Sequence, residues 1–256
     1  MLIDVLVCVL AGLGAGIGTG FAGMSAAAVI TPMLVAFMDI DPYTAIGIAL
    51  ASDVLASAFS AITYGKNKNL DVKNGLVMML SVIIFTVIGS YLGERVPETS
   101  LGNFSVLVTL IMGIRFILYP VSRPKSRMID LPLRRRLFLS ILWGAMIGMV
   151  CGLVGAGGGM MMLLVLTSVL GYELKAAVGT SVFIMTFTAL TGSVSHFMMG
   201  GEPSLPALLI CMASTLLFAR LAALVANHIS PKTMGRTVGV ILTFLSLTIL
   251  VVGWLA

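Results

Sequence analysis

Residues 12–25 read GLGAGIGTGFAGMS and residues 144–159 read GAMIGMVCGLVGAGGG, in a chain of 256 residues. Shifting the chain by 132 positions places the first stretch on the second and superimposes five glycines on five: Gly12, Gly16, Gly20, Gly23 and Gly47 on Gly144, Gly148, Gly152, Gly155 and Gly179. Since glycine is only 28 of the 256 residues, composition alone hardly explains this coincidence. The sequence therefore predicts an internal duplication, a common feature of transporters.

The composition indicates a membrane protein. Hydrophobic residues make up 59% of the chain and charged residues 10%, and the mean hydropathy is +1.13. Soluble domains carry about 25% charged residues, so a chain with so few charges must turn much of its surface to lipid. The apolar runs are long and continuous, whereas the strands of a membrane barrel alternate apolar and polar residues. We therefore expect an all-α integral membrane protein.

The apolar runs follow the same order in each half of the chain. Each half begins with a glycine-rich stretch and a short apolar follower, and then has three runs of about 20 residues, long enough to span a bilayer. The first membrane repeat is predicted at residues 1–120, a basic cytoplasmic linker with six Lys and Arg residues at 121–136, and the second repeat at 137–256. The expected runs are 2–23, 25–38, 42–64, 72–93 and 101–119, then 137–155, 160–170, 174–199, 205–227 and 233–254.

The positions of the basic residues predict how the halves are oriented. If each glycine-rich pair enters and leaves the membrane on one side, each half crosses three more times and the two repeats are inverted. With the linker in the cytoplasm, twelve Lys and Arg residues outside the spans then lie inside and one lies outside. Four crossings per half would give nine against four. Because cytoplasmic loops are enriched in Lys and Arg, we expect two inverted repeats, each a broken or re-entrant helix pair followed by three transmembrane helices, in the inner (cytoplasmic) membrane.

The glycine runs themselves have two interpretations. Glycine costs about 1 kcal/mol relative to alanine inside a helix, so clustered glycines need a reason. Close helix packing explains those that repeat every four residues. At the ends of the runs, the backbone could instead leave the helix at membrane depth, where the start of a following short helix would favour an anion. On that interpretation the substrate-binding residues are Gly23, Met24, Ser25, Gly155, Gly157, Gly158 and Gly159.

A few polar residues inside the predicted spans are further candidates. Asp53 is either a structural partner of a buried polar group or the residue that couples transport to protons or cations. Arg220 could bind a charged substrate, form a salt bridge with Asp53, or extend its side chain to the membrane surface. The hydroxyls of Thr180 and Ser181 could bond to their own helix or donate to a bound oxyanion.

Other classes of function find little support in the sequence. The spans contain no paired carboxylates, no serine with a histidine or lysine partner and no HExxH motif, so we do not expect an enzyme. The three cysteines, Cys8, Cys151 and Cys211, lie far apart inside apolar runs, and we expect no metal and no cofactor. The basic stretch has no soluble domain beside it, so we expect no nucleic-acid partner.

The glycine breaks and the segments that follow them resemble the TauE/SafE family of membrane permeases. The resemblance rests on residues 20–25 (GFAGMS) through 31–34 (TPML), on 152–159 (GLVGAGGG), and on 45–47 (AIG) and 177–181 (AVGTS). It covers nearly the whole chain, although Leu164 stands where the first repeat has Pro32. The resemblance implies transport of small sulfur-containing or carboxylate anions such as sulfite, thiosulfate, sulfoacetate or other sulfonates, by export in most members.

Together these patterns predict a secondary transporter with an anion site near the middle of the membrane. Protons are the expected coupling ion, acting through Asp53, and export is the expected direction. The alternative is a passive anion channel with the same site and no coupled ion. The expected partners are a small organic or inorganic anion and the lipid bilayer, and an oligomer is compatible with the sequence.

Overall fold

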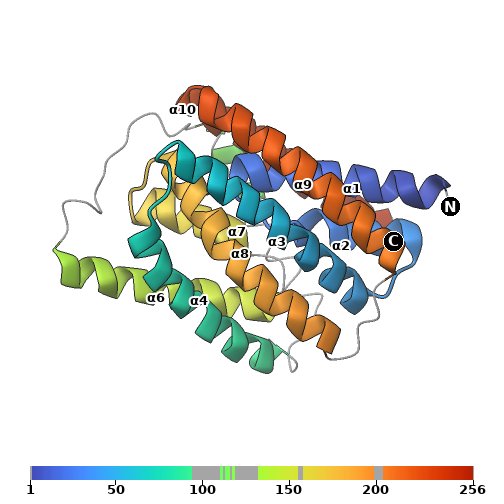
Figure 1. Cartoon of the computed structure of the whole chain (residues 1–256), viewed down its shortest axis with the longest axis horizontal. Coiled ribbons are helices and arrows are strands. Elements are labelled where there is room, and N and C mark those ends of the chain that lie inside the picture. The colour runs from blue at the N-terminus through green and yellow to red at the C-terminus, as the bar shows by residue number, and fades with distance from the viewer. Residues whose placement is uncertain are drawn as a thin grey trace.

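The computed structural model describes residues 2–93, 110–111, 113–115, 117–118, 132–154, 158–198 and 204–255. These residues contain helices and no strand, which confirms the all-α prediction (Figure 1). The elements are α1 (Leu2–Ala22), α2 (Ala27–Met38), α3 (Pro42–Lys66), α4 (Val72–Gly93), α6 (Leu133–Val154), α7 (Gly158–Leu164), the π-helical turn η1 (Val165–Val169), α8 (Leu174–Met198), α9 (Leu205–His228) and α10 (Pro231–Leu255).

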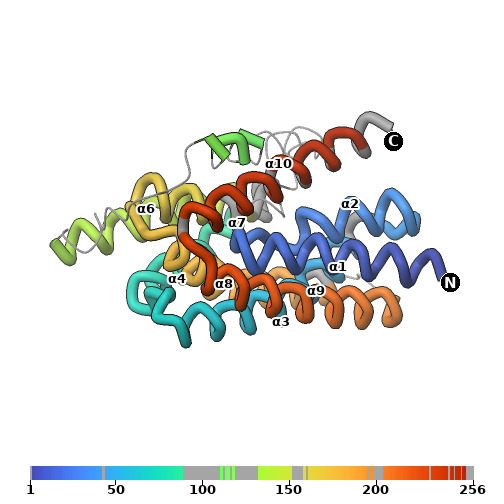
Figure 2. The backbone as a smooth tube through the Cα atoms, turned by 90° about the horizontal axis from the view of Figure 1, so that it is seen from above, coloured from blue at the N-terminus to red at the C-terminus, as the bar shows by residue number. Residues whose placement is uncertain are grey.

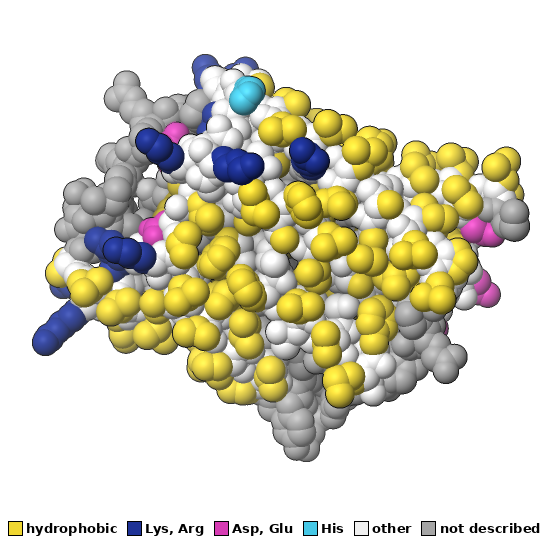
Figure 3. Space-filling model, viewed as in Figure 1, with side chains coloured by type: hydrophobic (Ala, Val, Ile, Leu, Met, Phe, Trp, Pro, Cys, Tyr) yellow, Lys and Arg dark blue, Asp and Glu magenta, His cyan; other side chains and the backbone are white. Residues whose placement is uncertain are grey.

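The surface of the helix bundle is that of a multi-pass membrane protein. Four of the described helices are long and apolar enough to cross a bilayer: Leu2–Ala22, Thr44–Lys66, Leu174–Val194 and Leu205–His228. Large apolar side chains such as Leu6, Ile62 and Leu209 point outward. Hydrophobic side chains cover most of the face seen in Figure 3, and Lys and Arg side chains gather toward its left half.

Two predicted boundaries need comment. The span expected at 101–119 falls largely outside the described residues. The helix α6 begins at Leu133, so the last three arginines of the predicted linker, at 134–136, form part of its first turn. Charged residues are good helix formers, which explains why the helix extends beyond its apolar run.

The first glycine run ends in a real break of the helix. The helix α1 stops at Ala22, the backbone at Gly23 takes a positive φ of 61°, and α2 starts again at Ala27. Glycine adopts this left-handed conformation without the steric cost that a Cβ brings. The hydroxyl of Thr19 donates to the carbonyl of Met24 at 2.9 Å and holds the turn. The second break, at 155–157, lies outside the described residues.

The glycines that repeat every four residues serve close packing between helices. Gly12, Gly16 and Gly20 let α1 lie against α9, and Gly144 and Gly148 let α6 lie against α4. A Cβ at Gly16 would stand 2.6 Å from the carbonyl oxygen of Thr215 and 2.8 Å from the Cβ of Phe218. Because such distances leave no room for any side chain, the packing interpretation of these glycines holds.

Candidate functional site

The start of α7 touches the first helix break. A Cβ at Gly159 would lie 2.5 Å from the carbonyl oxygen of Gly23 and 2.9 Å from the backbone nitrogen of Ser25. These residues are more than 130 positions apart in the chain. The absence of a side chain at 159 therefore allows α7, in the second half of the sequence, to meet the first helix break inside the bundle.

Ser181 on α8 ties the two segments together. Its hydroxyl donates to the carbonyl of Gly23 at 3.2 Å and has a longer contact, 3.5 Å, with the carbonyl of Gly159. The side chain is fully buried. The sequence offered two roles for this hydroxyl, a bond to its own helix or to a bound oxyanion. The structure shows a different one, in which the hydroxyl bonds to the backbone of other segments.

Replacing Ser181 by alanine should destabilise this junction. The buried carbonyl of Gly23 would lose its donor, and an unsatisfied buried group costs about 1–3 kcal/mol. We expect the melting temperature of the purified protein in detergent to fall. Thr186→Ala on the same helix is the matched control, because its hydroxyl bonds only to the Val182 carbonyl of its own helix. Equal melting temperatures for the two variants would contradict a bracing role.

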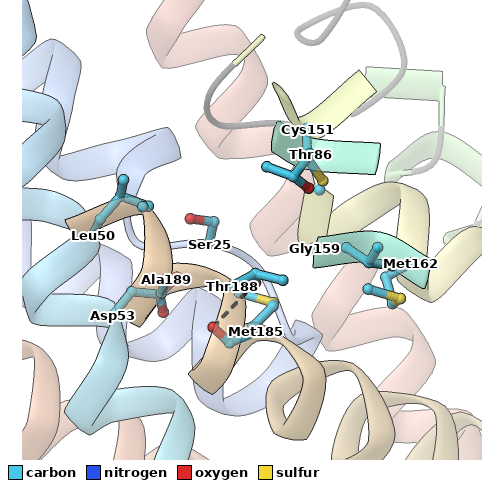
Figure 4. A pocket seen from close by; sticks show the side chains of 13 residues that line it. Ser25, Leu50, Asp53, Thr86, Cys151, Gly159, Met162, Met185, Thr188 and Ala189 are labelled. Carbon is cyan, nitrogen blue, oxygen red and sulfur yellow. Dashed lines mark hydrogen bonds between the residues drawn. The ribbon is translucent and has the colours of Figure 1, made fainter. Parts of the chain in front are cut away.

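A cavity of 130 Å³ lies beside the junction (Figure 4). Its volume equals that of about four water molecules in the liquid. Leu50, Asp53 and Ala189 lie on one side of the view in Figure 4, and Thr86, Cys151 and Met162 lie on the other. The full lining comes from five helices and the first break: Ser25, Leu50, Asp53, Val82, Thr86, Cys151, Gly158, Gly159, Met162, Met185, Thr188, Ala189 and Gly192.

The carboxylate of Asp53 is the charged group of this cavity. The side chain is only 1% exposed. Its Oδ1 accepts a hydrogen bond of 2.9 Å from the hydroxyl of Ser57, whereas Oδ2 is buried without a hydrogen-bond partner. The other polar groups that act on the carboxylate are the hydroxyls of Thr19 and Ser25 and the backbone N–H of Ala26. The carboxylate thus faces the beginning of α2.

The rest of the lining is mildly polar and rich in sulfur. Thr86 contributes a buried hydroxyl without a hydrogen-bond partner, and the hydroxyl of Thr188 contacts carbonyls of its own helix. Cys151, Met162 and Met185 add a thiol and two thioethers, and no basic side chain occurs among the lining residues that the structure describes. Such a cavity could hold a small polar solute, with hydroxyls and backbone N–H groups as donors.

The structure brings together part of the predicted site. Ser25, Asp53, Gly158 and Gly159 line the cavity. Gly23 and Met24 are buried in the break beside it, and Gly155 and Gly157 fall outside the described residues. The hydroxyl of Thr180 accepts the backbone N–H of Asp71 at 3.2 Å and thus contacts the α3–α4 loop.

Arg220 does not reach the cavity. The helix α9 turns Thr215, Ala219 and Ala223 inward, and the next position, 220, is rotated by about 100° and is exposed. The expectation that Arg220 binds substrate at the break therefore has no geometric support. Within the described part of the chain, no ion pair joins it to Asp53, whose described hydrogen bond comes from Ser57.

Sequence reasoning missed several lining residues, among them Thr86, Cys151, Met162 and Met185. One signal was present for Met185. The same shift of 132 that aligns the glycines places Asp53 on Met185, and both residues line the cavity. The two halves thus contribute equivalent positions to one space, a carboxylate from one and a thioether from the other.

Comparison with known proteins gives a consistent result. The profile of the sulfite exporter TauE/SafE family matches residues 8–249. The chain is similar to the probable membrane transporter protein YunE of Bacillus subtilis (strain 168), with 27% identity over 215 residues that cover 76% of this chain and 79% of the relative. The probable membrane transporter protein YjnA of the same organism is 24% identical over 240 residues, or 89% of this chain and 91% of the relative. A probable membrane transporter protein of Haemophilus influenzae is 28% identical over 212 residues, 79% and 77% of the two chains.

Proposed function

This chain belongs to the sulfite exporter TauE/SafE family, and from that premise we propose that it is a secondary transporter for a small sulfur-containing or carboxylate anion. The anion is of the sulfite, sulfoacetate or sulfonate kind and crosses the cytoplasmic membrane, with export as the direction and protons as the coupling ion. The observation that carries the proposal is the cavity beside the contact between α7 and the first helix break. Broken helices that line a buried polar space are a recurrent construction of transporter substrate sites.

The pairing of the helices supports two inverted repeats, at 1–120 and 137–256, joined by a cytoplasmic linker at 121–136. The helix α1 of the first half packs on α9 of the second, and α6 of the second packs on α4 of the first. The contacts correspond closely, since Gly12 faces Ser214 where Gly144 faces Ser81. The helices α1 and α6 also extend into the bundle from opposite ends (Figure 2). This exchange of partners is the pattern expected of a duplicated and inverted unit.

The beginning of α2 is the proposed anion-binding element. This helix has 12 residues, and the amide end of a helix carries a partial positive charge that favours anions. Ser25 lines the cavity just before this helix begins, and Gly158 and Gly159 of α7 line it as well. We include Gly155 and Gly157 of the second run in this proposal and leave Arg220 out, because its side chain is exposed.

Transport is proposed rather than catalysis because of the groups that line the cavity. The described lining offers one carboxylate and one thiol, and it contains no histidine or lysine to activate the thiol. The named relatives are probable membrane transporter proteins.

A thermal-shift screen tests the proposal. The purified protein is heated with sulfite, sulfate, thiosulfate, sulfoacetate, taurine or simple carboxylates. A transported anion should stabilise the fold by about 2.7 kcal/mol at a hundred times its Kd, and the shift should grow with concentration. A flat response to every anion would contradict the proposal.

Two variants locate the binding that such a screen detects. Ala189→Val adds volume to the cavity wall and should remove the ligand-induced shift, because Ala189 lines the space and is 3% exposed. Arg220→Gln distinguishes the two candidate sites. A cavity site predicts an unchanged shift in this variant, whereas a site at Arg220 predicts its loss.

A further inference from the structure

The amide groups at the start of α2 are largely occupied within the protein. The N–H of Ala27 bonds to the hydroxyl oxygen of Ser25 at 3.3 Å, and the N–H of Ala28 bonds to the Ser25 carbonyl at 3.2 Å. Ser25 and Asp53 line the same cavity, so the carboxylate of Asp53 lies beside the start of α2. The ionised side chain of Asp53 is therefore itself the anion at this helix end, in the place where a transported anion would bind.

The groups around Asp53 do not offset a second negative charge. The elements packed against α3 include α1, α2, α8 and α9. Toward the carboxylate, α1 and the break present the hydroxyls of Thr19 and Ser25, and Arg220 of α9 is exposed. From α8, Met185, Thr188 and Ala189 line the cavity, and the second titratable group in the described lining is the thiol of Cys151 on α6. Ionisation of that thiol would add negative charge and not remove it.

We propose that the cavity accepts the transported anion only when Asp53 is protonated, so that one proton and one anion occupy it together and cross the membrane in the same direction. This inference rests on the proposed function and specifies its coupling. Two negative charges about 4 Å apart in a partly polar interior repel strongly enough to weaken binding about a thousand-fold. A protonated carboxyl removes that repulsion and offers its own O–H as a donor to the anion.

The proton balance is simple. A proton from water on one side binds the carboxylate, whose Oδ2 has no hydrogen-bond partner, and it leaves to water on the other side after the anion. For a monoanion the step moves no net charge, and for a dianion it moves one negative charge. Export of a monoanion then proceeds only while the outward gradient of the anion exceeds the opposing pH gradient.

The test uses the full chain in proteoliposomes with methanesulfonate and thiosulfate as separate probes. Neither anion titrates near neutral pH, so a proton that accompanies it must be carried by the protein. Labelled uptake is measured while the pH gradient and the membrane potential are set independently, and empty vesicles give the background. Methanesulfonate should accumulate inside the vesicles about tenfold for each pH unit by which the outside is more acidic than the interior. Its accumulation should not respond to the membrane potential. Thiosulfate should respond to both gradients.

The outcomes separate the inference from the proposed function. Uptake that follows only the electrochemical gradient of the anion, with no response to the pH gradient, would overturn the co-transport of a proton. It would leave transport itself in place, as in a passive channel. Accumulation when the vesicle interior is more acidic than the outside would also overturn it, because that is the behaviour of exchange for a proton. No uptake of either probe above background would count against the proposed function for small sulfur anions, and against the inference with it.

Discussion

Gly159→Ala should abolish transport and destabilise the folded protein by about 3 kcal/mol, at the upper end of the usual cost of overpacking. The added Cβ would lie 2.5 Å from the carbonyl oxygen of Gly23, 2.9 Å from the backbone nitrogen of Ser25 and 2.8 Å from the sulfur of Met185. The methionine sulfur can move, but the two backbone atoms belong to the first break and cannot yield without separating it from α7. The measurement is the melting temperature of the purified variant, followed by uptake in proteoliposomes.

Gly14→Ala is the matched control for this substitution. The residue lies in the same kind of glycine-rich stretch, but a Cβ there meets only a side-chain methyl group of Val29, at 3.2 Å. Alanine is favoured over glycine inside a helix by about 1 kcal/mol, so the control should melt at or slightly above the wild-type temperature and still transport. If Gly159→Ala behaved like Gly14→Ala, α7 and the first break would not be in contact.

Asp53→Asn should eliminate accumulation driven by a pH gradient. Asparagine keeps the size of the side chain and can still pair with Ser57, which donates to Asp53 at 2.9 Å, so we expect the variant to fold. It cannot bind or release a proton, and the roughly tenfold accumulation per pH unit expected of the wild type should fall to no accumulation. The readout is the steady-state ratio of labelled methanesulfonate across the vesicle membrane at a fixed pH gradient.

Asp41→Asn provides the comparison on the same helix. Asp41 is an exposed carboxylate that caps the start of α3 through the N–H of Thr44, and asparagine caps helices about as well as aspartate. This variant should keep the pH-driven accumulation. A transporter that still concentrates its anion after Asp53→Asn would show that the coupling group lies elsewhere.

The helices and the first break could be predicted from the sequence because both depend on local chemistry. The limits expected at 72–93 match α4, and those at 2–23 and 25–38 come close to α1 and α2. Apolar runs report helices in a bilayer directly, since backbone groups in lipid must bond within the helix. The first break coincides with a glycine, Gly23, whose backbone takes the positive φ that glycine adopts readily.

The site could be predicted only in part, because it depends on which way each side chain points. Thr180 and Ser181 are neighbours in the sequence, yet one bonds to the α3–α4 loop and the other to the first break. Arg220 has a mid-span position that suggested a ligand, but its rotation about the α9 axis places it outside. Thr86 and Cys151 come from two helices that are brought together only by packing. Their spacing in the sequence therefore does not predict that they line the same cavity.

The most direct test of the account is a cryo-electron microscopy map of the protein at acidic pH with saturating anion, compared with an anion-free map under the same conditions. The anion is the one that gives the largest thermal shift. We predict new density in the cavity between Ser25, Asp53 and Gly159, with the contact between α7 and the first break intact. New density beside Arg220, or anywhere else on the protein while the cavity stays unchanged, would contradict the claim that this junction forms the transport site.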